Sequence, residues 1–369
     1  MKVLVELLRE YSAQSAEACG VDRRLFRIAG CQIDLRFAGQ RWSDQLTKAF
    51  SHLAVTDRAS LLDAHRLTVH LWDGSNPPRN AILRAYLTQL ADHWFAEYAG
   101  PRGELLDLNC PSIRAFYHPG PDILSVVDLD EDVAYYWKRD LAPIPYYEAG
   151  SPLRALLHAW MSNRGLWFIH AAAIGTESGG VLLAGKGGSG KSTSALACLD
   201  SPLRYAGDDY CVVSLDGRDA RAFSLYNTAK LNGDTDLERF PQYAPWVWNP
   251  SRTATDKATI FLYDHIPDRL ISEFPLRAIL LPVVTSEANT RLEPCGARDA
   301  LLALAPSTMA QLPASGPADM AFIARLARSV PCFRLYAGRS LEGIPASIAS
   351  YLDSESSLTG ERDCVSARL

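Results

Sequence analysis

The sequence predicts a mixed α/β (α+β) fold: an N-terminal mixed α/β domain, followed by a core built around a glycine-rich loop. Hydrophobic residues make up 48% of the 369 residues and charged residues 21%, so a sizeable core can be buried. Strand-like alternation and helical apolar stripes follow one another along the chain. After residue 165 the order becomes strand, loop, helix, strand, which is typical of α/β or α+β cores.

The first 145 residues are expected to form a substrate-binding or accessory domain of mixed class. Periodicity predicts a helix over Asn80–Tyr98, with an apolar stripe that includes Ile82, Leu83 and Trp94. The segment His118–Asp122 predicts a turn between paired strands. The strand candidates are Leu25–Ile28, Gln32–Phe37, Leu67–Trp72, Ile113–Tyr117 and Ile123–Asp128.

Two features of this half allow more than one interpretation. The acidic residues from Asp128 to Asp132 fit a solvated turn better than a metal site. Tyr135, Tyr136 and Trp137 are candidates for exposed aromatic residues lining an acceptor groove, although core packing explains them equally well.

Leu141–Pro145 is the best candidate for a linker, and residues 150–350 are expected to form the second domain. The almost continuous apolar run Leu276–Thr285 predicts its central strand. The polar segment 351–369 is expected to be a loose tail. The other elements predicted are a helix over Pro152–Asn163, a strand over Leu166–Ile174, a strand over Thr259–Tyr263, helices around Ala297–Leu304 and Ala318–Ala327, and a strand over Cys332–Tyr336.

Residues 185–192 complete the pattern G-x-x-x-x-G-K-[ST], the motif of a phosphate-binding loop. The apolar run Val181–Ala184 predicts a buried strand before it, and Ser192–Leu199 predicts a helix after it. Strand, loop and helix therefore come in the order that such a loop requires. The alternative is a glycine-rich turn that binds nothing.

Each residue type in the loop has a separate physical reason. Gly185, Gly187, Gly188 and Gly190 allow positive φ and let the backbone approach a phosphate. The backbone N–H groups of the loop, with Ser189 and Thr193 at its end, then face the anion. Lys191 is expected to face solvent as a mobile cation for the outer phosphates. The Ser192 hydroxyl is placed to ligate Mg²⁺.

Asp208 and Asp209 follow the loop helix, at the end of the strand-like segment 204–207. One carboxylate can hold Mg²⁺ and the other can accept a hydroxyl proton. Because neighbouring strand residues point to opposite faces, both can serve one site only if the strand ends or twists there. The alternative is a helix–strand turn that is rich in Asp.

The composition excludes several classes of function. A net charge of −5 argues against a nucleic-acid partner. The eight cysteines contain no C-x-x-C pair and no zinc-finger spacing, which indicates thiols in a reducing compartment. No apolar run reaches the roughly 18 residues of a membrane helix, and residues 1–20 lack a signal-peptide core. We therefore expect a cytoplasmic protein without a membrane partner.

A block of motifs resembles the C-terminal kinase domain of HPr kinase/phosphorylase, whose fold is similar to that of phosphoenolpyruvate carboxykinase. The likeness is specific over residues 169–213 and weaker over 214–350, where Leu225–Leu231 and Leu301–Ser307 resemble family segments. The motifs that carry it are Ile169-His170-Ala171, Gly179 to Gly185, Gly188 to Ser192, Ala195-Leu196 and Tyr205 to Asp209.

The resemblance implies ATP as phosphate donor and Mg²⁺ as cofactor, and it implies roles for five residues. Asp208 would be the general base on the acceptor hydroxyl. Asp209 would join Ser192 in binding Mg²⁺, and Lys191 would hold the β- and γ-phosphates. His170 would lie close to the acceptor, although a core histidine at a strand end is the alternative.

Chains of about this length with a different N-terminal half also occur among tailoring kinases of lasso-peptide gene clusters, and this chain is similar to that group. The resemblance implies a serine of a precursor peptide as acceptor. Lys230, Arg252 and Lys257 lie where an acceptor or its phosphate could be held, with ordinary surface charge as the alternative.

Three functions are therefore compatible with the sequence. The first is an ATP- and Mg²⁺-dependent kinase acting on a serine hydroxyl of a peptide. The second is a small-molecule hydroxyl kinase on the same core, and the third is a non-catalytic nucleotide-binding regulatory protein. A homo-oligomer is compatible with all three.

Overall fold

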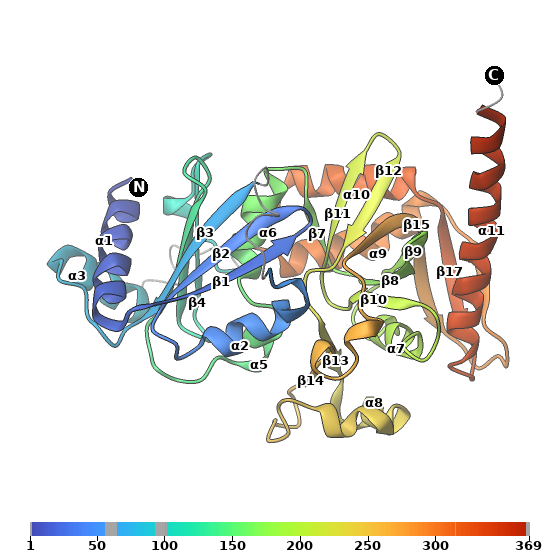
Figure 1. The fold of residues 1–369 in the computed structure, drawn as a ribbon, viewed down its shortest axis with the longest axis horizontal. Coiled ribbons are helices and arrows are strands. Elements are labelled where there is room, and N and C mark those ends of the chain that lie inside the picture. The colour runs from blue at the N-terminus through green and yellow to red at the C-terminus, as the bar shows by residue number, and fades with distance from the viewer. Residues whose placement is uncertain (1, 56–64, 93–99, 101, 314, 367–369) are drawn as a thin grey trace. The chain divides into compact units, whose positions relative to one another are not determined.

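The computed structural model describes residues 2–55, 65–92, 100, 102–313 and 315–366. The chain divides into two compact units, coloured by residue number in Figure 1. Unit 1 comprises Met1–Arg164 and Ala310–Ser315, and unit 2 comprises Gly165–Met309 and Gly316–Leu369. Both units contain helices and sheets, which confirms the predicted α/β class.

The division between the units falls later in the chain than the proline-containing segment Leu141–Pro145. Helix α6 (Arg154–Ser162) packs against strands β4 (Ile113–His118) and β5 (Ile123–Asp128) of unit 1 and so belongs to that unit. Its side chains from Ala155 to Met161 are all buried, which explains why the helix stays with the sheet that precedes it.

Unit 1 is built on a six-stranded sheet of order β1-β2-β3-β6-β5-β4. The pairs β2·β3 and β3·β6 are parallel, and the others are antiparallel. Ala29 and Gly30 join β1 to β2 with φ of 48° and 80°, as a tight two-residue hairpin turn requires. The strands are β1 (Val21–Ile28), β2 (Cys31–Ala38), β3 (Arg66–Asp73), β4 (Ile113–His118), β5 (Ile123–Asp128) and β6 (Val133–Lys138).

All five strands predicted in this half are present, whereas β6 was not predicted. Tyr135, Tyr136 and Trp137 lie on β6 and are 4% exposed or less, so of the two interpretations core packing is confirmed and an exposed groove lining is not. Tyr135 and Trp137 pack in the apolar core under α1 instead.

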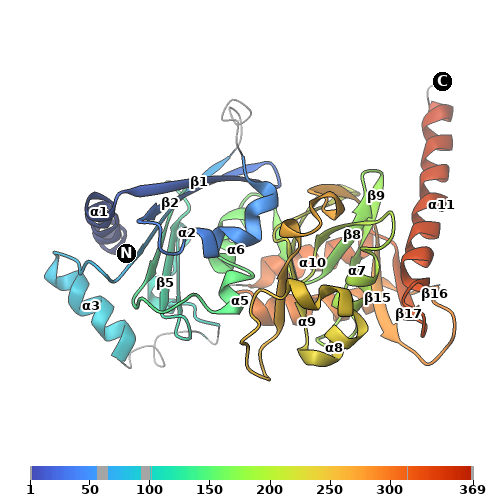
Figure 2. The ribbon, with the colours of Figure 1, turned by 60° about the horizontal axis from the view of Figure 1, so that its bottom comes forward.

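Helices cover both faces of the sheet of unit 1 (Figure 2). Helices α1 and α3 supply buried residues such as Leu8 and Leu87 to the core on one face. Ile82, predicted to lie in the α3 stripe, is 74% exposed, and Trp94 and residues 93–98 of that prediction lie outside the described residues. The helices are α1 (Lys2–Cys19), α2 (Ser43–Thr47), α3 (Ala81–Asp92), α5 (Tyr146–Ala149) and α6, with short 3₁₀ turns at Lys48–Leu53 and Leu106–Leu108.

Unit 2 is built on a nine-stranded sheet in which β15 is central, as its apolar run predicted. Strand β15 pairs with β12 at its start, with β9 in its middle and with β17 at its end. The strands are β7 (Trp167–Ile169), β8 (Ala172–Thr176), β9 (Gly179–Leu183), β10 (Arg204–Gly207), β11 (Cys211–Asp216), β12 (Asp219–Phe223), β15 (Glu273–Val284), β16 (Arg291–Pro294) and β17 (Cys332–Ala337). A separate hairpin pairs β13 (Thr228–Leu231) with β14 (Ala258–Phe261).

The single strand predicted over Leu166–Ile174 is two strands, because the chain changes partners at His170. Strand β7 pairs with β11, whereas β8 pairs with β9 and β10. Alternate residues of β8 face opposite sides of the sheet: Ala173 joins one core and Ala172 the other. Burial on both sides explains why β8 is apolar from Ala172 to Gly175.

Two layers of helices enclose this sheet. Helices α9 and α10 pack on one face, with the Phe322 ring stacked 5.1 Å from that of Trp167. Helices α7 and α11 and the β13–β14 hairpin pack on the other. The helices are α7 (Lys191–Ala197), α8 (Gly233–Arg239), α9 (Ala297–Gln311), α10 (Pro317–Ser329) and α11 (Gly343–Ser366), with 3₁₀ turns at Pro241–Trp246, Leu262–Asp264 and Pro267–Arg269.

The segment predicted as a loose tail differs from that prediction, because α11 continues through Ser366. Among the described residues, no helix combines the length and apolar character needed to cross a bilayer.

Candidate active site

The glycine loop connects β9 to α7, as the sequence predicted. Gly188 and Gly190 have φ of 77° and 97°, a region that favours glycine. Gly187 does not have the positive φ that was expected. A Cβ on Gly185 would lie 2.5 Å from the Ser189 hydroxyl oxygen, so a larger residue would displace the Ser189 side chain.

Lys191 is the first residue of α7, and its ammonium group lies over the loop. Nζ donates hydrogen bonds to the carbonyl oxygens of Gly185 at 2.9 Å and Lys186 at 3.3 Å. The residue is 7% exposed, so the expectation that Lys191 faces solvent is wrong. Burial lowers the pKa of Lys191, and the negative charges of Asp208 and Asp209 oppose that shift.

Asp208 and Asp209 lie in the break between β10 and β11, directly opposite the break at His170. Gly207 pairs with Ala173 on one side of the two breaks, and Cys211 pairs with Ile169 on the other. A Cβ on Gly207 would lie 2.9 Å from the Tyr210 carbonyl oxygen, which explains glycine before the acidic pair. The strand does end here, so neither carboxylate is constrained to an opposite face.

Asp208 is a buried carboxylate, 2% exposed. Its Oδ2 accepts the backbone N–H of Lys230 at 3.3 Å, and its Oδ1 accepts no hydrogen bond from the described residues. Burial and the adjacent Asp209 charge raise the pKa of Asp208, opposed by the Ser192 hydroxyl and the Lys230 amide. Asp208 is thus the carboxylate of the pair that more readily takes up a proton.

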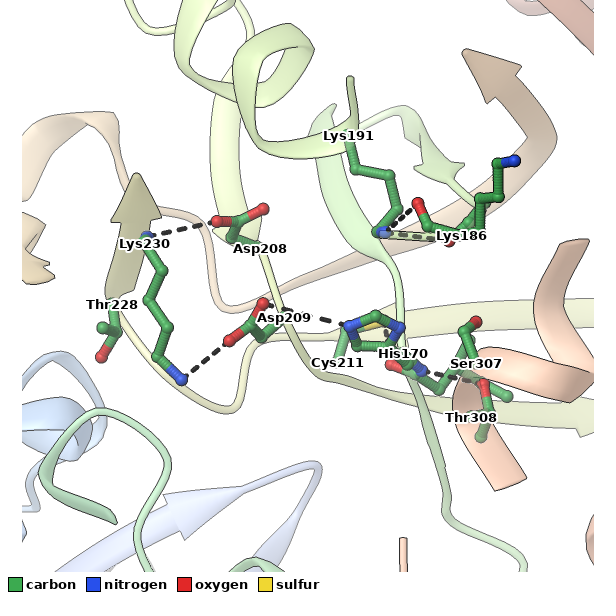
Figure 3. Close-up of polar contacts among 12 residues, drawn as sticks. His170, Lys186, Lys191, Asp208, Asp209, Cys211, Thr228, Lys230, Ser307 and Thr308 are labelled. Atoms are coloured by element: carbon green, nitrogen blue, oxygen red, sulfur yellow. Dashed lines mark hydrogen bonds and ion pairs between the residues drawn. The ribbon is translucent and has the colours of Figure 1, made fainter. Parts of the chain in front are cut away.

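Asp209 has the opposite electrostatic environment. Its Oδ2 lies 2.7 Å from Lys230 Nζ, in an ion pair (Figure 3). Burial acts to raise the pKa of Asp209, but the charges of Lys230 and Lys257 outweigh it and lower the pKa. Asp209 therefore stays ionised beside a less acidic neighbour, a division of properties that active sites use for acid–base chemistry.

His170 faces the acidic pair from across the two breaks (Figure 3). Its Nε2 lies 4.0 Å from Asp209 Oδ1, and its backbone N–H donates to the Thr308 hydroxyl at 3.1 Å. Burial lowers the pKa of His170 to about 4, with Asp209 acting in the opposite direction. The imidazole is consequently neutral at pH 7 and can accept or donate a hydrogen bond.

The residues next to the loop have the chemistry of a Mg²⁺ site that is completed by a ligand's phosphates. Among the described residues, no three His, Cys, Asp or Glu side chains are placed to hold a metal. Magnesium typically takes one or two protein carboxylates together with phosphates and water. The Ser192 hydroxyl and the partly exposed Asp209 carboxylate fit such a donor set, and the buried Asp208 Oδ1 beside them accepts no hydrogen bond from the described residues. The Ser192 hydroxyl lowers the pKa of Asp208 through a hydrogen bond. The resemblance had implied Asp209 as its partner in binding Mg²⁺.

The structure brings together most residues selected from the sequence. Five of them lie close together: Lys191, His170, Asp208, Asp209 and Lys230. The charge of Lys257 acts to lower the pKa of both carboxyl groups. Arg252 lies in a turn, where its backbone N–H donates to the Asn249 carbonyl oxygen at 3.2 Å.

Two contacts next to the site were not predicted from the sequence, although Tyr205 belongs to one of the family motifs. Thr308 holds the backbone of His170, and it immediately follows the segment Leu301–Ser307, which had been noted for its family resemblance. Tyr205, which donates its hydroxyl to the Thr228 carbonyl oxygen at 2.8 Å, ties β10 to the β13 strand that carries Lys230. Neither contact has a local sequence signal, because each joins segments distant in the chain.

Among known proteins, the similarity to this chain lies with solved structures. No family model matches the chain, and no curated protein matches it. The HPr(Ser) kinase/phosphatase from Coxiella burnetii matches 53% of this chain and 98% of its own, at 11% identity and a TM-score of 0.28. With so low a TM-score, the match by itself assigns neither an activity nor residue roles.

The contact between Lys230 and Asp209 predicts energetic coupling between the two residues. Lys230→Met should destabilise the protein, because Asp209 loses the cation nearest to it. Asp209→Asn in the same chain should recover part of that loss, with a coupling energy of roughly 0.5–3 kcal/mol. Urea unfolding of the wild type, both single variants and the double variant measures this value. Additive single effects would contradict the ion pair.

Proposed function

We propose that this protein is an ATP- and Mg²⁺-dependent kinase that transfers phosphate to a serine hydroxyl of a peptide. The proposal takes unit 2 as a core of the HPr-kinase kind, as the resemblance of residues 169–213 implies. It takes residues 1–145 as the part that serves the acceptor.

One observation carries the proposal. A glycine loop with its lysine lies beside two adjacent carboxylates, one buried and one partly exposed, whose pKa values shift in opposite directions. Phosphoryl transfer needs a cradle for phosphates, a cation for the developing charge and an acceptor of the hydroxyl proton. The described residues of this site include a candidate for each.

The proposed division of work follows from these environments. Gly185, Gly187, Gly188, Ser189, Gly190 and Thr193 belong to the loop and helix start that would hold the phosphates of ATP. Lys191 exchanges its bonds to the Gly185 and Lys186 carbonyl oxygens for the β- and γ-phosphates. Ser192 and Asp209 would hold Mg²⁺, which neutralises phosphate charge when bound.

The transfer step requires a base next to the acceptor hydroxyl. Asp208 fits this role, because its pKa is raised and its Oδ1 is available to accept the proton. The hydroxyl oxygen then bonds to the γ-phosphorus as the bond to ADP breaks. In this proposal neutral His170 lies close to the acceptor, as the resemblance implies, where it would orient the hydroxyl without adding charge.

A serine of a lasso precursor peptide is the acceptor proposed from the resemblance. Mass spectrometry of serine peptides and small hydroxyl compounds, incubated with ATP, Mg²⁺ and the full chain, tests it. A gain of one phosphoryl group on the peptide supports the proposal, whereas phosphorylation of small compounds alone would contradict the peptide assignment.

Nucleotide binding should depend on Lys191. We expect Lys191→Ala to reduce ATP affinity strongly, because the loop loses its phosphate-facing cation, while Lys186→Ala has little effect. Lys186 is the matched control, since it lies in the same loop with an exposed side chain. Isothermal titration with ATP and Mg²⁺ measures both. Equal affinities in the two variants would contradict the phosphate-loop assignment.

Substitution of the two carboxylates should produce two different kinetic defects. Asp208→Asn should keep ATP and Mg²⁺ binding but reduce transfer about 100-fold or more, as expected when a positioned base is lost. Asp209→Asn should raise the Mg²⁺ concentration needed for half-maximal transfer. Asp216→Asn, at an exposed position in the same unit, is the control.

Transfer rates across a Mg²⁺ titration distinguish the two roles. The opposite result, a Mg²⁺ defect in Asp208→Asn and a rate defect in Asp209→Asn, would show that the roles are exchanged. The proximity of Ser192 to Asp208 makes this comparison informative.

A further inference from the structure

A second group of charged residues lies in unit 1, on the sheet face that α1 covers only in part. Arg23 of β1 is paired in register with Arg36 of β2, and Arg36 with His70 of β3. Cross-strand partners share a face of a sheet. These three side chains therefore form a row across three adjacent strands.

The row is organised around one buried carboxylate, that of Asp34. Arg23 donates to both oxygens of Asp34, at 2.7 Å and 3.0 Å, and Arg36 donates at 3.0 Å and 3.2 Å. Arg66 of β3 forms a third ion pair with Asp34. Burial acts to raise the pKa of Asp34, but the three guanidinium groups outweigh it and lower the pKa.

The charges of this cluster do not cancel. Three guanidinium groups against one carboxylate leave two positive charges in excess. The arginine side chains are 33%, 37% and 41% exposed, whereas Asp34 is fully buried. Asp34 thus fixes the guanidinium groups in place, while their outer donors remain accessible from solvent.

A groove with a volume of about 390 Å³ opens beside this cluster, between α1 and strands β1–β3. Figure 2 shows α1 beside the start of β1, which pairs with the end of β2. Arg9 of α1 joins Arg23 and Arg36 in its wall, and Ala13, Ala16 and Val21 contribute apolar surface. Arg9 also donates to the Tyr135 hydroxyl at 3.3 Å and is influenced by Asp128 and Glu131.

The pKa of His70 shows that positive charge dominates around the groove. Burial lowers the pKa of this imidazole, and the charges of Arg36 and Arg9 lower it further, against the opposite effect of Asp34. The groove therefore combines positive charge with an apolar floor.

We propose that this groove binds an acidic peptide segment in which carboxylate and apolar side chains alternate. Arginine matches carboxylates bidentately, and a guanidinium already oriented by Asp34 loses less freedom on binding. The apolar floor would bury the side chains between the acids, which an inorganic anion would leave uncovered. This inference rests on the proposed function, since it takes the segment as the recognition element of the peptide acceptor.

The test uses the full-length protein without ATP or Mg²⁺. The probe is a fluorescein-labelled ten-residue peptide in which Glu alternates with Leu or Ala around one serine, followed by fluorescence anisotropy. Its counterpart carries Gln in place of Glu. We expect the acidic probe to bind, its affinity to fall with added salt, and the Gln counterpart to bind at least about tenfold more weakly.

Two alanines of α1 provide a matched pair of variants. Ala13→Glu places a carboxylate in the groove and should weaken binding of the probe about tenfold or more, because like charges oppose each other. Ala18→Glu makes the same change at an exposed position of α1 outside the groove lining and should have little effect. Neither removes an arginine from the Asp34 cluster, so folding is preserved.

A second pair tests the arginines themselves. Arg36→Gln should weaken probe binding, and Arg24→Gln should not, because Arg24 pairs with Asp22 and Asp44 and does not line the groove. Absence of probe binding to the wild type, equal binding of the Gln counterpart, or equal affinities of Ala13→Glu and Ala18→Glu would each overturn the inference. Displacement of the probe by a single-stranded oligonucleotide or by phosphate at equal charge concentration would assign the groove to those anions instead.

Failure of this inference is distinguishable from failure of the proposed function. Lys191→Ala should retain probe binding, because Lys191 lies in unit 2. Probe binding without any phosphate transfer would support the groove and contradict the kinase assignment. If the protein transfers phosphate to a peptide and Ala13→Glu does not change that transfer, the kinase assignment is supported and the groove is contradicted.

Discussion

The burial of Asp208 directly beside a second carboxylate, that of Asp209, is the constraint on which the site of unit 2 depends. Asp208 and Asp209 are neighbours in one turn, and two like charges removed from water repel each other and lose hydration. The ion pair with Lys230 compensates Asp209, whereas Asp208 is left with a raised pKa and an oxygen that accepts no hydrogen bond from the described residues. Because of this asymmetry, one carboxylate can take up a proton while its neighbour stays ionised.

The topology of the sheet places the remaining groups around that pair. The break between β7 and β8 lies opposite the break between β10 and β11, since Ile169 pairs with Cys211 and Ala173 with Gly207. The same geometry that interrupts both strands therefore brings His170 to the acidic turn. The loop that carries Lys191 reaches it from β9, which is the neighbour of β8 in the sheet.

Local signals made much of this predictable from the sequence. The glycine loop, its strand and its helix have strict local requirements for φ and for apolar burial, and they lie where the pattern predicted. The apolar run of β15 likewise identified a strand buried on both faces.

The break at His170 could not be predicted, because Leu166–Ile174 is apolar on both sides of it and only the pairing partners change. The burial of Lys191 depends on how the loop folds back, and the ion pair of Lys230 depends on a hairpin distant in sequence. In unit 1, Tyr135 to Trp137 could equally have been surface or core until the helices over the sheet were placed.

The central claim is that the loop and the acidic turn act together on one Mg²⁺–nucleotide complex. A crystal structure of the wild-type protein with Mg²⁺ and a non-hydrolysable ATP analogue tests it most directly. The account predicts phosphates along residues 185–192, Lys191 turned onto them, and a metal about 2.1 Å from oxygens of Ser192 and Asp209. Asp208 should remain outside the metal's ligands and face the space beside the γ-phosphate. A nucleotide bound elsewhere, or a metal that contacts neither Ser192 nor the acidic pair, would contradict the account.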